Sequence, residues 1–199
     1  MRLQTSVSVL ALAASVAGAG CYPDRLDTTN YDVVATVYDT SATFHKPTFA
    51  MSDSIVHLVP PGGNDNISRA FDAQIIARVR QNMTARGYVE VANPTTADFD
   101  ILLAASTTEY QGYYWGYWCD YWGYWYPYGC YYPPYWGTYS YTVGSLFVAM
   151  TEPSTASAGK VGMVWLNVAN GLAGTGATAS RLTAAVDQMF TQSPYVTAQ

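Results

Sequence analysis

The chain has 199 residues, of which 50% are hydrophobic and 12% are charged, and its formal net charge at pH 7 is −5. This length suits a single domain with a buried core behind a short leader. The negative charge and the lack of any basic stripe argue against nucleic acid as a partner.

The first 20 residues predict a lipoprotein signal peptide. Arg2 gives a cationic start, residues 7–17 form an almost unbroken apolar run, and small residues then lead directly to Cys21. The run is shorter than the roughly 20 apolar residues that a membrane-spanning helix needs. We expect cleavage before Cys21, lipid attachment to its thiol, and a polar tether over residues 21–30. The alternative is an ordinary secretory signal, cut for example after Ala19, that leaves Cys21 as a plain thiol.

A lipid anchor would place the protein in the cell envelope. Asp after the lipidated cysteine keeps many such lipoproteins at the inner membrane, whereas this chain has Tyr22. We therefore expect an outer-membrane lipoprotein that faces the periplasm. With Cys21 acylated, Cys119 and Cys130 remain as an even pair in an oxidising compartment, and we predict a disulfide between them.

Residues 31–199 are predicted to form a single domain. Apolar residues recur every four positions from Ile67 to Met83, which predicts a helix that Asp65 or Asn66 caps and Gly87 ends. A last helix is predicted over about residues 180–192. Strands are predicted over residues 32–38, 44–51, 88–91, 99–107, 141–150 and 161–169. Because each helix has one apolar stripe, we predict an α+β fold in which two helices cover one face of an antiparallel sheet.

A Tyr/Trp-rich insertion over residues 110–141, predicted as a long loop between two strands, interrupts this pattern. It holds 13 of the 18 tyrosines and five of the six tryptophans. So many rings cannot all be buried in a small domain, and Tyr and Trp suit interfaces with membrane headgroups, sugars and proteins. The alternative is a loop that folds on itself through ring stacking. The candidate contact surface consists of Tyr113, Tyr114, Trp115, Tyr117, Trp118, Tyr121, Trp122, Tyr124, Trp125, Tyr126 and Trp136.

No set of residues in the sequence indicates catalysis. His45 and His57 do not stand in a ligand spacing with each other, with Cys or with carboxylates, and no catalytic or phosphate-binding motif occurs. Asp98 and Asp100 fall on one face of a strand entry and could hold a hard cation, although a polar strand entry is the simpler interpretation. We therefore expect neither an enzyme nor a metal or cofactor site.

A series of short segments carries a resemblance to a known family. These are residues 31–34, 44–49, the Gly87-Tyr88 helix exit, residues 97–102, an aromatic and proline-containing stretch, residues 141–146, Val164-Trp165, Met189-Phe190 and Pro194. Their order resembles the DUF4136 lipoprotein family, over nearly the whole chain after Cys21. Many outer-membrane lipoproteins without an assigned activity share this resemblance, so it implies an envelope location and no particular chemistry.

These observations predict a lipid-anchored cell-envelope protein that acts as a non-catalytic binding or structural module. The aromatic insertion would be its contact surface, and its partners would be the membrane, through the lipid anchor, and an envelope protein or glycan. The alternative function is a lipoprotein that binds peptidoglycan or lipopolysaccharide glycans with the same rings, because sugars stack on exposed aromatic faces.

Overall fold

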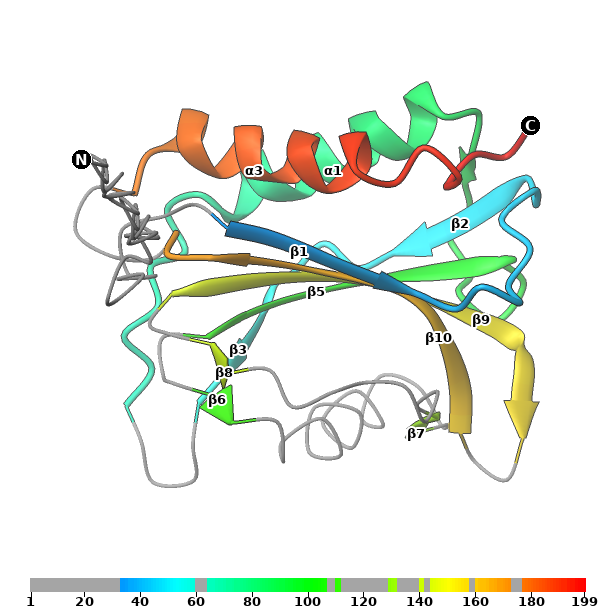
Figure 1. Ribbon diagram of the computed structural model, residues 1–199, viewed down its shortest axis with the longest axis horizontal. Coiled ribbons are helices and arrows are strands. Elements are labelled where there is room, and N and C mark those ends of the chain that lie inside the picture. Colours follow the sequence, from blue (N-terminus) through cyan, green and yellow to red (C-terminus); the bar gives the residue numbers. More distant parts are fainter. Residues whose placement is uncertain are drawn as a thin grey trace, which may run out of the picture.

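Eight strands of the described chain form one sheet, and two helices lie against one of its faces (Figure 1). A separate ribbon pairs β6 (Tyr110–Gln111) with β8 (Ser140–Tyr141). The computed structural model describes residues 33–59, 64–106, 110–111, 129–131, 140–141, 144–157, 160–172 and 177–199.

The strands of the main sheet follow the order β1-β10-β9-β5-β2-β4, with β3 beside β5 and β7 beside β10. Most of the strands predicted from the sequence are present, and β3 and β7 are additions. Their bounds are β1 (Val33–Tyr38), β2 (Thr48–Met51), β3 (Val56–Leu58), β4 (Val89–Glu90), β5 (Phe99–Ser106), β7 (Gly129–Tyr131), β9 (Ser145–Ser157) and β10 (Lys160–Asn170).

The sheet is mixed, so the prediction of an antiparallel sheet was wrong. Strands β1, β10, β9 and β5 run antiparallel to their neighbours in that series. Strands β2 and β3 run parallel to β5, β4 runs parallel to β2, and β7 runs parallel to β10. Helix α1 (Asp72–Ala85) carries the chain from β3 to β4, and a strand that returns after a helical crossover can run parallel. Short apolar stretches carry no sign of their pairing direction, which is why the pattern missed this.

Helix α1 begins later than its apolar spacing predicted. Residues 65–71, which we call the strap, precede it as irregular chain. In the strap the Asp65 carboxylate accepts a hydrogen bond from the Ile67 N–H at 3.1 Å, and the Ser68 hydroxyl accepts one from the Ala70 N–H at 3.3 Å. Such side-chain bonds compete with helical ones, so Ile67 falls outside the helix. The end of α1 is as predicted, because Gly87 adopts the left-handed conformation with φ of 89°.

Helix α3 (Ala179–Thr191) confirms the predicted last helix. Its N-cap is Thr178, whose hydroxyl accepts a hydrogen bond from the Arg181 N–H. The two helices are joined by Arg78 and Asp187, with 2.6 Å between Arg78 Nε and Asp187 Oδ1. The hydrogen bond from Arg78 is the main reason that the pKa of Asp187 lies below its usual value.

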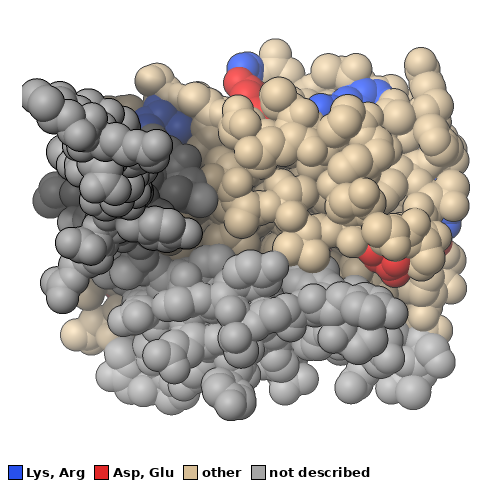
Figure 2. All heavy atoms as spheres, in the orientation of Figure 1, with Lys and Arg blue, Asp and Glu red and all other residues tan. Residues whose placement is uncertain are grey.

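On the side of the molecule that Figure 2 shows, charged side chains are few, and several lie along the helix layer.

The main core fills the space between the helices and one face of the sheet. Successive strand residues point to opposite faces, so Ile101 and Leu103 of β5 join this core, whereas Leu102 and Ala104 belong to the second face. No helix of the described chain covers the second face, although its apolar residues are buried. These are Val56, Leu58, Leu102, Ala104, Phe147, Ala149, Met163, Leu166 and Val168.

The aromatic insertion leaves and re-enters the sheet at one place. Ser106 at the end of β5 lies opposite Ser145 at the start of β9, and Tyr110 then pairs with Tyr141 in the β6–β8 ribbon. The insertion also contributes β7, which pairs with the first residues of β10. The sequence predicted a loop along the whole insertion, whereas β6, β7 and β8 are short paired strands within it. Residues 112–128 and 132–139 lie outside the described chain.

Candidate binding pocket

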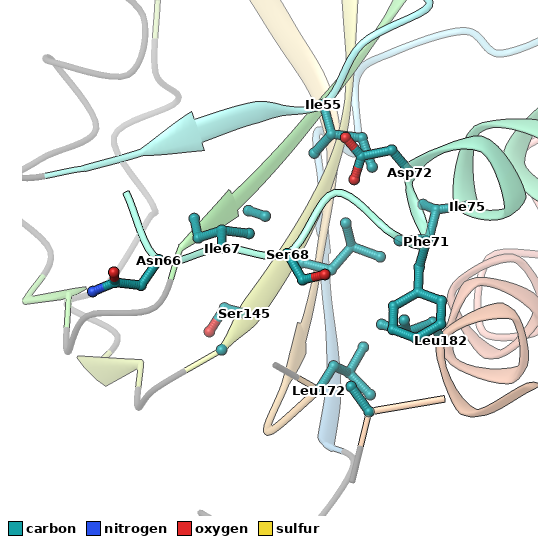
Figure 3. Close-up of a pocket in the computed structure, with 14 residues that line it drawn as sticks. Ile55, Asn66, Ile67, Ser68, Phe71, Asp72, Ile75, Ser145, Leu172 and Leu182 are labelled. Atoms are coloured by element: carbon teal, nitrogen blue, oxygen red, sulfur yellow. The ribbon is translucent and has the colours of Figure 1, made fainter. Parts of the chain in front are cut away.

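An apolar pocket with a volume of about 180 Å³ opens at one end of the helix–sheet interface (Figure 3). Its lining comes from segments that are distant in the sequence: the residue before β3, the strap with the first turn of α1, the end of β5, the start of β9, the chain after β10 and the start of α3. Nine of the lining residues are apolar, and among them are Ile67 and Phe71 of the strap, Ile75 of α1, Ala105 of β5, Leu146 of β9 and Leu182 of α3.

Two glycines position the floor of this pocket. Gly144 and Gly171 adopt φ values of 88° and 85°, a region that residues with a Cβ rarely occupy. These bends bring the start of β9 and the chain after β10 together, and the Leu172 N–H donates to the Gly144 carbonyl at 2.9 Å. Gly144 falls inside the strand that the sequence predicted over residues 141–150. It lies instead at the bend just before β9, where it lines the pocket.

Polar contacts hold the strap against the rest of the molecule. His57 Nδ1 lies 2.9 Å from both carboxylate oxygens of Asp65. Arg69 donates from Nη1 to the Ile55 carbonyl and to the Asp72 carboxylate, both at 3.3 Å. Burial acts to raise the pKa of Asp65, but the contacts with His57, with the Ile67 N–H and with Arg69 leave it below its usual value. Charged groups thus hold the strap in place, while the side chains that the strap turns into the pocket are mostly apolar.

The polar groups at the pocket are few. In Figure 3 the Asn66 side chain points away from the other labelled residues, whereas Ser68 and Asp72 stand beside the apolar side chains. Ser68 accepts the hydrogen bond from Ala70, and Asp72 is paired with Arg69. Both groups therefore already have partners within the strap and the first turn of α1.

The two histidines and two aspartates considered in the sequence do not form a cluster. His57 is buried, with 3% of its side chain exposed, and its Nε2 has no hydrogen-bond partner among the described residues. Asp98 accepts hydrogen bonds from the backbone N–H and the hydroxyl of Thr48, at 3.0 and 2.6 Å, which ties β5 to β2. Within the described chain, no group of three or more His, Cys, Asp or Glu side chains is placed to hold a metal ion.

The other predicted site residues lie outside what the structure describes. Cys21, Cys119 and the aromatic residues of the candidate contact surface belong to the undescribed parts of the chain, and Cys130 lies in β7, where only the backbone is described. Lipidation, the Cys119–Cys130 disulfide and the aromatic contact surface therefore stay predictions. None of the helices in the described chain is long and apolar enough to cross a membrane.

Sequence reasoning missed the pocket, because Ile67 and Phe71 were assigned to the apolar stripe of a helix. One local signal was available. Asp65 stands two residues before Ile67, and Ser68 two residues before Ala70, which is the spacing of side-chain-to-backbone turns. The remaining lining residues come from distant segments, and no local pattern groups them.

Comparison with known proteins places the chain in a family. The model of the family described as "Domain of unknown function (DUF4136)" matches residues 34–195. The crystal structure of a DUF4136 family protein from Bacteroides thetaiotaomicron is similar, with a TM-score of 0.67 and 29% identity, over 84% of this chain and 98% of that chain.

Two further solved structures are too dissimilar to support an argument. A PelC dodecamer from Paraburkholderia phytofirmans has a TM-score of 0.38 and 14% identity, over 84% of this chain and 98% of that chain. A PDZ domain protein from Parabacteroides distasonis has a TM-score of 0.43 and 14% identity, over 81% of this chain and 35% of that chain. The comparison with curated proteins gave no match. Because the family model covers most of its length, the chain belongs to the DUF4136 family.

Proposed function

We propose that this protein is a lipid-anchored cell-envelope protein that binds a small apolar group and catalyses no reaction. The observation that carries the binding part of the proposal is the pocket between the strap, the two helices and the sheet. Concave, mostly apolar sites with a few polar groups are the usual places for ligands. The anchor part of the proposal rests on the sequence that leads to Cys21.

The chemistry beside the pocket favours binding over catalysis. A nucleophile or a general base must have a free atom that reaches the reacting group. The Ser68 hydroxyl accepts a backbone hydrogen bond, and the Asp72 carboxylate is 3.3 Å from the Arg69 guanidinium. His57, the histidine that contacts the strap, has its Nδ1 against Asp65 and only 3% of its side chain exposed. These groups hold the wall in place.

Thermal unfolding of the mature protein with different ligand classes tests the proposal. We expect 1-octanol to raise the melting temperature, because a ligand that binds only the folded state stabilises it. Peptidoglycan fragments and lipopolysaccharide glycans should leave the melting temperature unchanged. Stabilisation by the glycans alone would contradict the proposal and would favour the alternative in which the aromatic insertion binds sugars.

A further inference from the structure

We infer that the pocket binds an unbranched aliphatic chain that carries an uncharged polar head. The free end of the chain enters the pocket to a depth of about six to eight carbons. This inference rests on the proposed function and specifies its ligand. It follows from three properties of the described residues, which are the size of the pocket, the chemistry of its lining and the charges at its edge.

The volume limits how much of a ligand can enter. The pocket holds about 180 Å³. In another protein, an apolar cavity of about 150 Å³ binds benzene, a molecule of six carbons. Pockets for whole drug-sized ligands are larger, at roughly 300–1,000 Å³. This pocket therefore accepts one apolar end, and the remainder of the ligand stays outside.

The lining favours an aliphatic chain over an aromatic ring. Phe71 is the single aromatic residue among the lining residues, and the others that contribute large apolar surface are Ile55, Ile67, Ile75, Leu146, Leu172 and Leu182. An aromatic ligand gains from stacking with several rings or from a cation over its face. Branched aliphatic side chains offer neither, so a ring gains only apolar burial here, whereas a flexible alkyl chain gains the same burial and can also adapt to the shape of the pocket.

The edge of the pocket favours a head without charge. The Asp72 carboxylate there is paired with Arg69, at 3.3 Å, and Ser68 contributes a hydroxyl. A cationic head would compete with Arg69 for Asp72, and an anionic head would lie beside the Asp72 carboxylate. A hydroxyl, amide or ester head disturbs neither group, and the Ser68 hydroxyl, whose oxygen accepts from the Ala70 N–H, can donate its own O–H to such a head.

A series of 1-alkanols from butanol to dodecanol, measured by calorimetric titration of the mature protein, tests the chain-length limit. Each added CH₂ that enters the pocket should raise the affinity about fourfold. The increase should stop at about six to eight carbons, when the pocket is full. Octanoate should bind more weakly than 1-octanol, and indole should bind more weakly than both. Tighter binding of indole or octanoate, or an affinity that keeps rising to dodecanol, would overturn the ligand class.

Two neighbouring alanines on β5 give a matched pair of variants. Ala105 lines the pocket, whereas Ala104 is fully buried on the second face of the sheet. Ala105→Leu should place its side chain in the pocket, lower the affinity for 1-octanol at least tenfold and leave the melting temperature unchanged or higher. Ala104→Leu adds the same atoms to a close-packed site, so it should lower the melting temperature and keep the chain-length limit.

The proposed function and the aliphatic-chain inference are contradicted by different results. If Ala105→Leu folds and binds 1-octanol as wild type does, the pocket is not the binding site, and the proposed function fails with it. If Ala105→Leu abolishes binding but the alkanol series shows no limit, or indole binds best, then the pocket stands and the aliphatic-chain inference is wrong.

Discussion

Asp100 is a carboxyl group in an environment that disfavours its charge. It lies on β5 with 6% exposure, and burial raises its pKa to about 7, even though a backbone hydrogen bond from Ile101 acts in the opposite direction. The folded protein thus holds this proton up to a higher pH than the unfolded chain does. Because the folded state binds this proton more tightly than the unfolded state, the free energy of unfolding decreases as the pH rises from about 4 to about 7.

Replacing Asp100 with Asn should remove this pH dependence. We expect the free energy of unfolding of Asp100→Asn, relative to wild type, to rise between pH 4 and pH 7 and to stay constant above, by on the order of a few kcal/mol. Urea unfolding across this pH range measures it. Asp187→Asn is a control of opposite sign, because the pKa of Asp187 is lowered by Arg78 and this variant should lose stability at neutral pH. A constant difference between Asp100→Asn and wild type at all pH values would contradict the prediction.

Trp165 donates a hydrogen bond within the core. Its side chain is fully buried, and its indole N–H donates to the Ser193 hydroxyl at 2.8 Å. Ser193→Ala should lower the free energy of unfolding by about 1–3 kcal/mol, because it removes the hydroxyl that accepts from a buried donor. Denaturant unfolding followed by Trp fluorescence measures this loss. Ser54→Ala, at an exposed serine, is the control, and an equal effect of both changes would show that the bond to Trp165 contributes nothing.

At the scale of elements, Arg86 joins the end of α1 to the end of α3. Its guanidinium donates to the carbonyls of Ser193 and Val196, at 3.1 and 3.0 Å, and also to the carbonyl of Phe190. Arg86 is the C-cap of its own helix α1, where the dipole of that helix favours a cation. In the structure the negative end that it serves belongs to α3, because the two helices pack side by side and both end near the C-terminal segment. The Arg86 carbonyl in turn accepts from the Ala198 N–H at 3.0 Å.

Arg86→Ala should lower the free energy of unfolding by about 2–3 kcal/mol, because it removes charge-assisted hydrogen bonds to three carbonyls. Arg86→Lys should recover less than half of that loss, since a single ammonium group cannot reach all three acceptors with the geometry of the fork. Chemical denaturation of both variants provides the measurement. Full recovery by lysine would mean that charge near α3, rather than the fork, stabilises this junction.

At the scale of the whole molecule, the start of the domain and the pocket lie at the same end. Val33 at the start of β1 is opposite Asn170, two positions before the pocket residue Leu172. Cys21 stands 12 positions before Val33, so fully extended chain between them spans at most roughly 40 Å. A lipid on Cys21 would therefore keep the start of β1 within this distance of a membrane, with the pocket at the same end of the domain, and a membrane is a source of aliphatic chains.

Cys21→Ser tests the anchor. In a host that processes lipoproteins, wild-type protein should partition into the detergent phase, whereas Cys21→Ser should stay in the aqueous phase, because lipid attachment requires the thiol. Cys130→Ser is the control and should partition as wild type does. If wild type and Cys21→Ser both stay in the aqueous phase, the protein carries no lipid anchor, and the binding proposal must then be considered for an unanchored protein.

The sequence by itself determined the features that depend on neighbouring residues. The spacing of apolar side chains located α3 and most of α1, and Gly87 marked the end of α1, because helix periodicity and the left-handed stop are local properties. The strand stretches were also found, since β-branched and apolar runs favour extended chain. The order of these elements was enough to indicate the family to which the chain belongs.

Only the tertiary structure decided which strands run parallel, where α1 begins and what lines the pocket. The start of α1 is set by Asp65, which contacts His57 from β3 as well as its own backbone, and this contact removes Ile67 from the helix. The pocket combines residues from Ile55 to Leu182, and Asp100 acquires its raised pKa through burial between neighbouring strands. The strand directions, the pocket and the burial of Asp100 arise from contacts between segments that are distant in the chain, and a local pattern contains no information about which distant segment becomes the neighbour.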